Sequence, residues 1–303
     1  MNYLILFIGM LAVSFSPACN SVLVKEIHYS GLQVGAIRLL LASFGLLTVP
    51  HLWKTRQLIK TNAKVLLKSG FLLAVHFYFW TSAFAYSSLS SLVIFLAAQP
   101  LVSILMTFRD KKERISFSFL LCLLITIAGL LTIFWEDWKN SNSSAMGNIF
   151  VLIAEVAIVS YQLSIRKISQ KMPWITFNFS VWLIAGGLLF VAASLYNLSL
   201  GLNPWQSQKI SDWQPAQGLM AVCCLAFVCT YMGHGCYNIV IPRLKLVVIN
   251  LSAICLPVIS IFIGTLIGID TWPTGIRLVG SIVTVVGMAT ALIFDFKTHK
   301  KTT

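Results

Sequence analysis

The sequence predicts an all-α integral membrane protein whose ten transmembrane helices form two inverted five-helix repeats. Of its 303 residues, 58% are apolar and only 10% are charged, and the mean hydropathy is +0.86. Soluble domains do not reach such values. Apolar stretches of about 20 residues recur along the chain, long enough for a helix to cross a bilayer core of about 30 Å. Two parts of the chain also align with each other.

Ten apolar stretches qualify as spans. They cover residues 3–24, 32–52, 65–86, 89–108, 115–135, 148–168, 175–196, 216–239, 246–267 and 275–294. The spacers between them are short, and the longest are expected at 136–147 and 197–214. We therefore expect one membrane domain. The first span lacks the basic segment of a cleavable signal peptide, so we expect it to be retained.

The positions of Lys and Arg predict the orientation. With the N-terminus in the cytoplasm, cytoplasmic segments hold 17 of the 22 Lys and Arg residues, and the other side holds Lys25, Lys139 and Lys209. This asymmetry predicts a multi-pass protein of the cell inner (plasma) membrane with both termini cytoplasmic. It also explains the net charge of +13. Nucleic-acid binding would need basic residues gathered on one water-exposed face, so it is not expected.

An internal repeat is predicted by aligning residues 85–116 with 242–273. Pro100 falls on Pro257 and Glu113 on Asp270, and after a slip of one residue Gly129 falls on Gly287. Five spans are an odd number, so the second half must enter the membrane in the opposite orientation. We predict the first repeat at 1–138 and the second at 139–303. Inverted repeats are typical of alternating-access carriers, whose substrate site lies between the halves.

Several motifs resemble the EamA-type carriers of the drug/metabolite transporter (DMT) superfamily. The stretch KKERIS at 111–116 is similar to the GERLS signature of that family. Other matching positions are Asn20, Lys25, Arg38, Ala98 to Pro100, Tyr161 and Leu256-Pro257. The chain departs from the family at two places: Pro17 stands where the family often has Trp, and residues 268–271 form only a degraded GER-type loop. The resemblance implies ten spans and transport of a small metabolite, but the fold names a mechanism class and no substrate.

Glu155 and Arg38 are the charged residues of greatest interest, because charges inside a bilayer are either paired or functional. Glu155 is the only carboxylate predicted well inside a span, about seven residues into the sixth. Burial favours its protonated form, so it is the candidate for proton coupling or for holding a cationic substrate group. The alternative is a structural pair with Arg38 or with another buried donor. Arg38 itself could anchor an anionic group or extend to the outer interface.

Other polar and aromatic residues could line a cavity. His76 and Trp80 lie one helical turn apart, as do Asn178 and Trp182. Pro100 and Pro257 are the predicted helix-break or gating residues, since proline removes a backbone donor. Each lining residue could instead form an interhelical hydrogen bond or an aromatic belt. The predicted cavity residues are Asn20, Arg38, His76, Trp80, Gln99, Tyr161, Gln162, Asn178, Trp182, Tyr231 and His234.

The predicted function is a secondary active transporter that works by alternating access. The first choice is an exporter of amino-acid-like or aromatic metabolites. The alternative is an uptake carrier for a larger metabolite such as a nucleoside-linked cofactor, for example an S-adenosylmethionine-like one. The expected partners are a small-molecule substrate, the lipid bilayer, and protons or a counter-substrate.

A membrane-embedded lipid-modifying enzyme is the alternative of another class. It would need paired carboxylates, a nucleophile motif or a His-rich motif near one interface, and the sequence has none of these. We therefore expect no enzyme. No cofactor or metal site is predicted either, because the seven cysteines lie in apolar segments without a CxxC pair.

Overall fold

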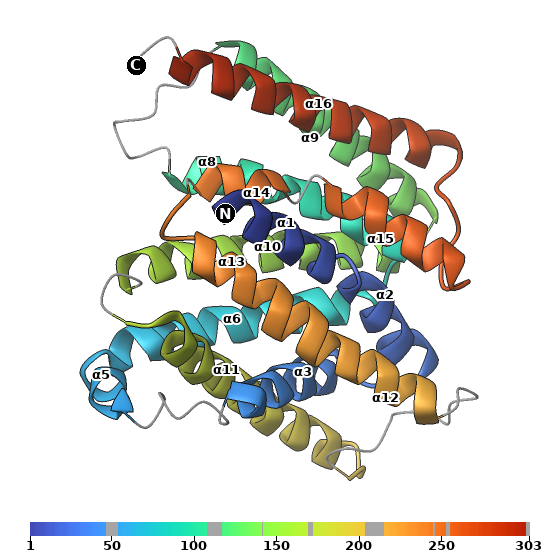
Figure 1. Ribbon diagram of the computed structural model, residues 1–303. Coiled ribbons are helices and arrows are strands. Elements are labelled where there is room, and N and C mark those ends of the chain that lie inside the picture. The colour runs from blue at the N-terminus through green and yellow to red at the C-terminus, as the bar shows by residue number, and fades with distance from the viewer. Residues whose placement is uncertain are drawn as a thin grey trace.

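The computed structural model describes residues 1–46, 54–107, 117–140, 142–168, 172–203, 215–244, 246–252 and 255–300, and these contain helices but no strand. The predicted all-α class is therefore confirmed. Long helices lie side by side, with α9 and α16 at one edge of the bundle and α3 and α11 at the other (Figure 1).

The helices before residue 141 follow the first five predicted spans in order. Their bounds are α1 (Asn2–Val13), α2 (Ser16–Ser21), the π-helix η1 (Val22–Glu26), α3 (Gly31–Leu46), α5 (Arg56–Thr61), α6 (Ala63–Ala83), α7 (Leu89–Phe95), the 3₁₀-helix η2 (Leu96–Ala98), α8 (Gln99–Thr107) and α9 (Phe117–Asn140).

The helices after residue 141 follow the other five. Their bounds are α10 (Asn142–Ile168), α11 (Trp174–Ser199), α12 (Pro215–Cys223), the π-helix η3 (Cys224–His234), α13 (Gly235–Val240), α14 (Leu246–Leu251), α15 (Cys255–Leu266) and α16 (Gly275–Lys300).

Eight helical stretches of the described residues are long and apolar enough to cross a membrane. Two shorter apolar helices, Gly31–Gly45 and Gly275–Thr290, coincide with the second and tenth predicted spans. Residues 47–52 of the second predicted span lie outside the described residues. The chain is thus a multi-pass membrane protein, with eight stretches rather than ten meeting the requirement by length and composition.

The prediction of a long spacer at residues 136–147 is wrong. Helix α9 continues to Asn140, and α10 already begins at Asn142. The polar residues here do not end the helices, because Asp137 is fully buried and paired. A paired carboxylate can lie in a helix end that hydropathy alone assigns to a loop.

Proline interrupts three of the predicted spans. Pro17 lies in the first turn of α2, Pro100 is the second residue of α8 after the η2 turn, and Pro257 is the third residue of α15. Proline has no N–H donor and its ring clashes with the preceding turn, so a helix restarts there. The backbone leaves the α-helical conformation at residues 14–15 of the first span and at 96–98 of the fourth. Residues 253–254 of the ninth span lie outside the described residues.

Two helix pairs make reciprocal close contacts. In the α9–α16 pair, a Cβ on Gly129 would lie 2.7 Å from the backbone nitrogen of Thr284, and a Cβ on Gly287 would lie 2.7 Å from the hydroxyl of Thr126. In the α3–α11 pair, Gly35 faces Leu189 and Gly186 faces Leu40, each at 2.9 Å from such a Cβ. Small residues allow this close approach of helices in a membrane.

Candidate functional site

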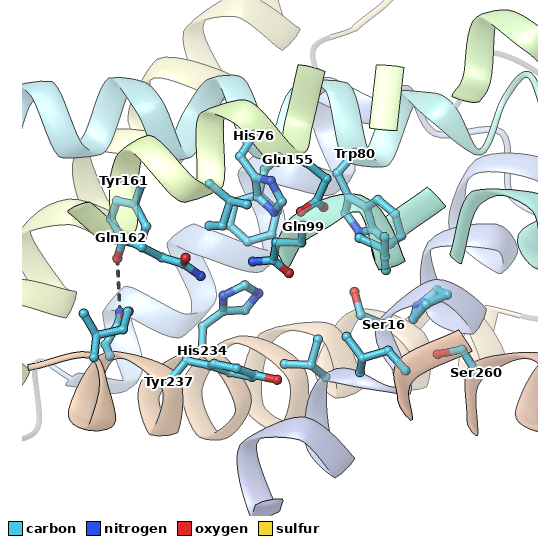
Figure 2. A pocket seen from close by; sticks show the side chains of 18 residues that line it. Ser16, His76, Trp80, Gln99, Glu155, Tyr161, Gln162, His234, Tyr237 and Ser260 are labelled. Carbon is cyan, nitrogen blue, oxygen red and sulfur yellow. Dashed lines mark hydrogen bonds between the residues drawn. The ribbon is translucent and has the colours of Figure 1, made fainter. Parts of the chain in front are cut away.

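A cavity lies between α6 and α10 on one side and η3 and α13 on the other (Figure 2). The space open to the centre of a water-sized sphere is about 70 Å³. We call it the central cavity, and its lining is Val13, Ser16, Pro17, His76, Phe77, Trp80, Leu96, Gln99, Glu155, Ile158, Tyr161, Gln162, His234, Tyr237, Asn238, Ile241, Leu256 and Ser260.

The structure brings seven of the predicted site residues together on this lining. They are His76, Trp80, Gln99, Glu155, Tyr161, Gln162 and His234. Five others do not line it: Asn20, Arg38, Asn178, Trp182 and Tyr231. The two prolines adjoin lining residues, since Pro100 follows Gln99 and Pro257 follows Leu256. Pro257 itself lines a separate apolar groove beside α16.

Glu155 carries an unpaired buried carboxyl group. Its residue is 1% exposed, and neither side-chain oxygen has a hydrogen-bond partner among the described residues. Because α10 starts earlier than predicted, Glu155 lies near the middle of the helix. Gln99 and Trp80 line the same cavity as its carboxyl group (Figure 2). A buried polar group without a partner costs stability, so an unpaired carboxyl in a cavity suggests a functional reason to keep it.

Arg38 is fully buried behind the cavity wall. Its Nε donates to the hydroxyl of Thr230 at 3.0 Å, one terminal nitrogen donates to the hydroxyl of Ser16 at 3.2 Å, and its guanidinium carbon lies 4.3 Å from the ring centroid of Phe77. The remaining terminal nitrogen has no partner among the described residues.

Both structural alternatives for Arg38 are therefore wrong. It neither pairs with Glu155 nor extends to the interface, because hydroxyl and aromatic partners hold it at depth.

The two histidines have different surroundings. Nδ1 of His76 lies 2.9 Å from the backbone oxygen of Ala154. A carbonyl oxygen can only accept, so Nδ1 carries the proton and Nε2 is left as an acceptor. The ring of His234 packs edge-on against Phe77, with centroids 5.3 Å apart. His234 ends the π-helix η3, a conformation frequent at functional sites.

A row of neutral side chains closes one end of the cavity. The amide nitrogen of Asn238 donates to the hydroxyl of Tyr161 at 3.1 Å and to the amide oxygen of Asn178 at 2.6 Å. Figure 2 shows the bond to Tyr161 as a dashed line. We call these three residues the Asn238 partition.

Beyond the partition lies a second hollow, which we call the inner cavity. It measures about 230 Å³ by the same criterion, and its lining is Ile165, Met172, Pro173, Trp174, Phe177, Asn238, Ile239, Pro242 and Arg243. Asn238 lines both cavities, so its side chain lies between them.

A charged cluster lies toward the other end of α10. Asp137 is fully buried and forms a 2.6 Å ion pair with Arg277, and it accepts hydrogen bonds from Asn148, at 2.7 Å, and from the hydroxyl of Ser91. These four residues, the Asp137 cluster, join α7, α9, α10 and α16. Asp137 lies three residues before the end of the apolar helical stretch Leu121–Asn140, in a part of the chain that the sequence assigned to a spacer.

The other predicted residues make contacts between helices. Trp182 packs against Tyr231 with ring centroids 6.4 Å apart, and the side-chain nitrogen of Asn20 donates to the hydroxyl of Ser16 at 3.1 Å. Gln99 donates from the cavity wall to Asn250 at 3.2 Å.

Sequence reasoning missed Ser16, Tyr237 and Asn238 as lining residues. Tyr237 and Asn238 follow His234 by three and four residues, and this helical spacing was the signal that could have found them.

No group of three or more His, Cys, Asp or Glu side chains in the described part of the chain is arranged to hold a metal ion. The features of this site are therefore a carboxyl, two imidazoles, amides and aromatic rings around a small cavity. Such a lining can bind a small molecule through hydrogen bonds, ring contacts and one acidic group.

Comparison with known proteins agrees with this architecture. Residues 1–135 match the family model of the EamA-like transporter family, which belongs to the DMT superfamily, so the predicted resemblance is confirmed. No curated protein matches the chain. A solved structure described as a crystal structure of a protein is 16% identical, with a TM-score of 0.69, and the match covers 98% of each chain. That similarity shows a shared fold.

Proposed function

We propose that this multi-pass membrane protein, whose residues 1–135 match the EamA-like transporter family, is a secondary carrier that moves a small metabolite by alternating access. The single observation that carries the proposal is the central cavity, with its unpaired buried carboxyl at Glu155. Intramembrane carboxylates of this kind mark substrate and proton pathways.

The reciprocal helix contacts support two inverted five-helix repeats, at 1–138 and 139–303. The same sequence separation links Gly129 to Gly287 and Thr126 to Thr284, and each glycine packs on the other repeat's threonine. A two-fold axis between two similar halves produces such exchange of roles. The Gly–Leu contacts between α3 and α11, at the other edge of the bundle, are also reciprocal.

We assign the two gates that alternating access requires to the two polar clusters on either side of Glu155 along α10. Along α10, Asn148 of the Asp137 cluster, Glu155 and Tyr161 of the Asn238 partition follow one another. At about 1.5 Å per residue, the carboxyl lies roughly 10 Å from either gate. With both termini cytoplasmic, the Asn238 partition faces the cytoplasm and the Asp137 cluster faces the outside of the inner membrane.

The size and lining of the cavity favour the smaller of the two substrate classes. A space of about 70 Å³ is far below the roughly 300 Å³ or more of typical ligand pockets. An amino-acid-like or aromatic metabolite fits this space better than a nucleoside-linked cofactor. Trp80, Tyr161 and Phe77 offer ring contacts to such a substrate, and Glu155 offers an acceptor for an amino group or a proton.

Counterflow in proteoliposomes tests this proposal. Purified protein would be reconstituted and screened with pools of labelled metabolites, with and without an imposed pH gradient. Wild type would be compared with Glu155→Gln and with the matched control Glu136→Gln. Glu136 lies at the end of α9, accepts a hydrogen bond from Asn140 at 3.1 Å and does not line the cavity.

Saturable exchange of one pool is expected, together with loss of the pH-driven component in Glu155→Gln alone. Loss of all exchange in Glu155→Gln would instead assign the carboxylate to substrate binding. Absence of exchange with every pool, from folded and inserted protein, would overturn the carrier proposal.

A further inference from the structure

A larger hollow lies on the other face of α6. This helix contributes His76, Phe77 and Trp80 to the central cavity, and it contributes Tyr78 and Ser82 to this larger hollow. The hollow measures about 550 Å³ by the same criterion. We call it the tyrosine crevice, and its principal polar side chains are Lys25, His28, Tyr29, Tyr78, Tyr86 and Tyr196. It lies beside the proposed transport path and not on it.

The crevice has the cationic side chain of Lys25 on its wall and carboxylates only beyond its lining. Lys25 and His28 line it, and none of its lining residues is acidic. Lys25 has no carboxylate within ion-pair distance among the described residues, since Asp270 and Glu26 act on it only from farther away. Asp270 already accepts hydrogen bonds from the backbone of Ser90, at 2.6 Å, and Thr271, at 2.8 Å. An ammonium group beside a hollow without a counter-charge attracts anions.

The start of α3 adds two backbone donors. The side chains of Ser30 and Gln33 cap this helix, because each accepts the other's backbone N–H, at 3.3 Å and 2.9 Å. The N–H groups of Gly31 and Leu32, which also line the crevice, have no acceptor among the described residues. The positive end of a 16-residue helix therefore faces the hollow with two free donors.

Two backbone features fix this geometry. A Cβ on Gly31 would lie 2.6 Å from the backbone nitrogen of Ser82, so only glycine lets α3 start this close to α6. His28 has φ +61°, a left-handed conformation that is costly for residues other than glycine. Such strain is often kept at ligand-binding sites, where the surrounding structure compensates for it.

We propose that the tyrosine crevice binds a phosphate group, held by the ammonium of Lys25 and the first-turn N–H groups of α3. Phosphate matches this set because it combines negative charge with several acceptor oxygens, which tyrosine and serine hydroxyls can also contact. The crevice gathers the ends of η1, α6 and α11 with the start of α3, at the height where tyrosines meet lipid head groups. The phosphate can therefore come from a lipid or from a soluble compound.

Thermal unfolding of the purified protein in a neutral detergent tests the proposal. The probes are phosphatidylglycerol, phosphatidylcholine and sn-glycerol 1-phosphate. The variants are Lys25→Gln, the charge-preserving Lys25→Arg, and Lys139→Gln as the control. Lys139 is an exposed lysine that does not line the crevice. A ligand at about 100 times its dissociation constant is expected to raise the unfolding temperature of wild type by about 5 °C.

Phosphatidylglycerol should stabilise wild type, Lys25→Arg and Lys139→Gln, and should lose this effect in Lys25→Gln. An equal effect of glycerol phosphate would identify a soluble phosphate compound as the ligand, whereas an effect of the lipid alone would identify a head group. Stabilisation of Lys25→Gln as large as that of wild type would overturn the proposal, as would no stabilisation by any probe. If Lys25→Gln does not fold, the same comparison with Lys25→Met, which removes the charge and keeps a long side chain, decides. Phosphorus analysis of protein purified from membranes gives a second readout.

Discussion

The two polar clusters that lie along α10 on either side of Glu155 differ in their chemistry. At one end Asp137 is fully buried, forms an ion pair with Arg277 and accepts two further hydrogen bonds. At the other end, Asn238 joins Tyr161 and Asn178 through two neutral hydrogen bonds. A hydrogen bond between neutral groups contributes about 1 kcal/mol net, whereas breaking a buried ion pair by removing one partner costs about 3–5 kcal/mol.

The two proposed gates, the Asp137 cluster and the Asn238 partition, should therefore differ in the free energy needed to open them. Opening the Asp137 cluster separates a fully buried carboxylate from Arg277, whose side chain is 32% exposed. Opening the Asn238 partition exposes three neutral groups that can bond water or substrate amides. The partition is also thin, because Asn238 alone borders both the central and the inner cavity. We therefore expect the described conformation to open more readily on the side of Arg243.

The largest effect should follow from Arg277→Ala. It leaves Asp137 buried without its cation, so the free energy of unfolding in detergent should fall by about 3–5 kcal/mol. Lys139→Gln, at the end of α9, is the control and should change stability by less than about 0.5 kcal/mol. The double variant Asp137→Ala with Arg277→Ala should regain part of the loss, because no unpaired charge remains. Equal stability of Arg277→Ala and the control would contradict the role given to this pair.

A medium effect should follow from Asn238→Leu. The substitution removes one donor from both Tyr161 and Asn178, so unfolding measurements should show a loss of about 1–2 kcal/mol. Tyr161→Phe removes a single acceptor and should lose about half as much. Both variants should speed counterflow, because the thinner gate is weakened and the charged gate is intact. Slower counterflow from stable protein would show that the partition does not limit opening.

The smallest effect should follow from Asp270→Asn. The new amide keeps one oxygen for the backbone N–H of Ser90, now bonded at 2.6 Å, and loses the charge and the exposed bond from the N–H of Thr271 at 2.8 Å. Charge-assisted hydrogen bonds are about twice as strong as neutral ones, so the unfolding free energy should fall by about 1 kcal/mol or less. Asp137→Asn serves for comparison and should lose several times more. If the two variants were equally destabilised, the ion pair with Arg277 would not be the main component of the charged gate.

Sequence alone determined the membrane class, the order of the apolar segments and the resemblance to EamA-type carriers. Hydropathy does this reliably because a helix in lipid must satisfy all its backbone groups within one segment. Helical spacing also placed His76 with Trp80 on one face, and both line the central cavity.

Only the tertiary structure decided which polar groups pair and which stay unpaired. Periodicity could not reveal that Arg38 sits behind Phe77, or that Glu155 has no partner among the described residues. Nor could hydropathy show that Asp137 is buried, because its partners Ser91, Asn148 and Arg277 come from three other helices. The physical reason is that backbone bonding is local in sequence, whereas the partner of a buried charge is fixed by packing between segments far apart in the chain.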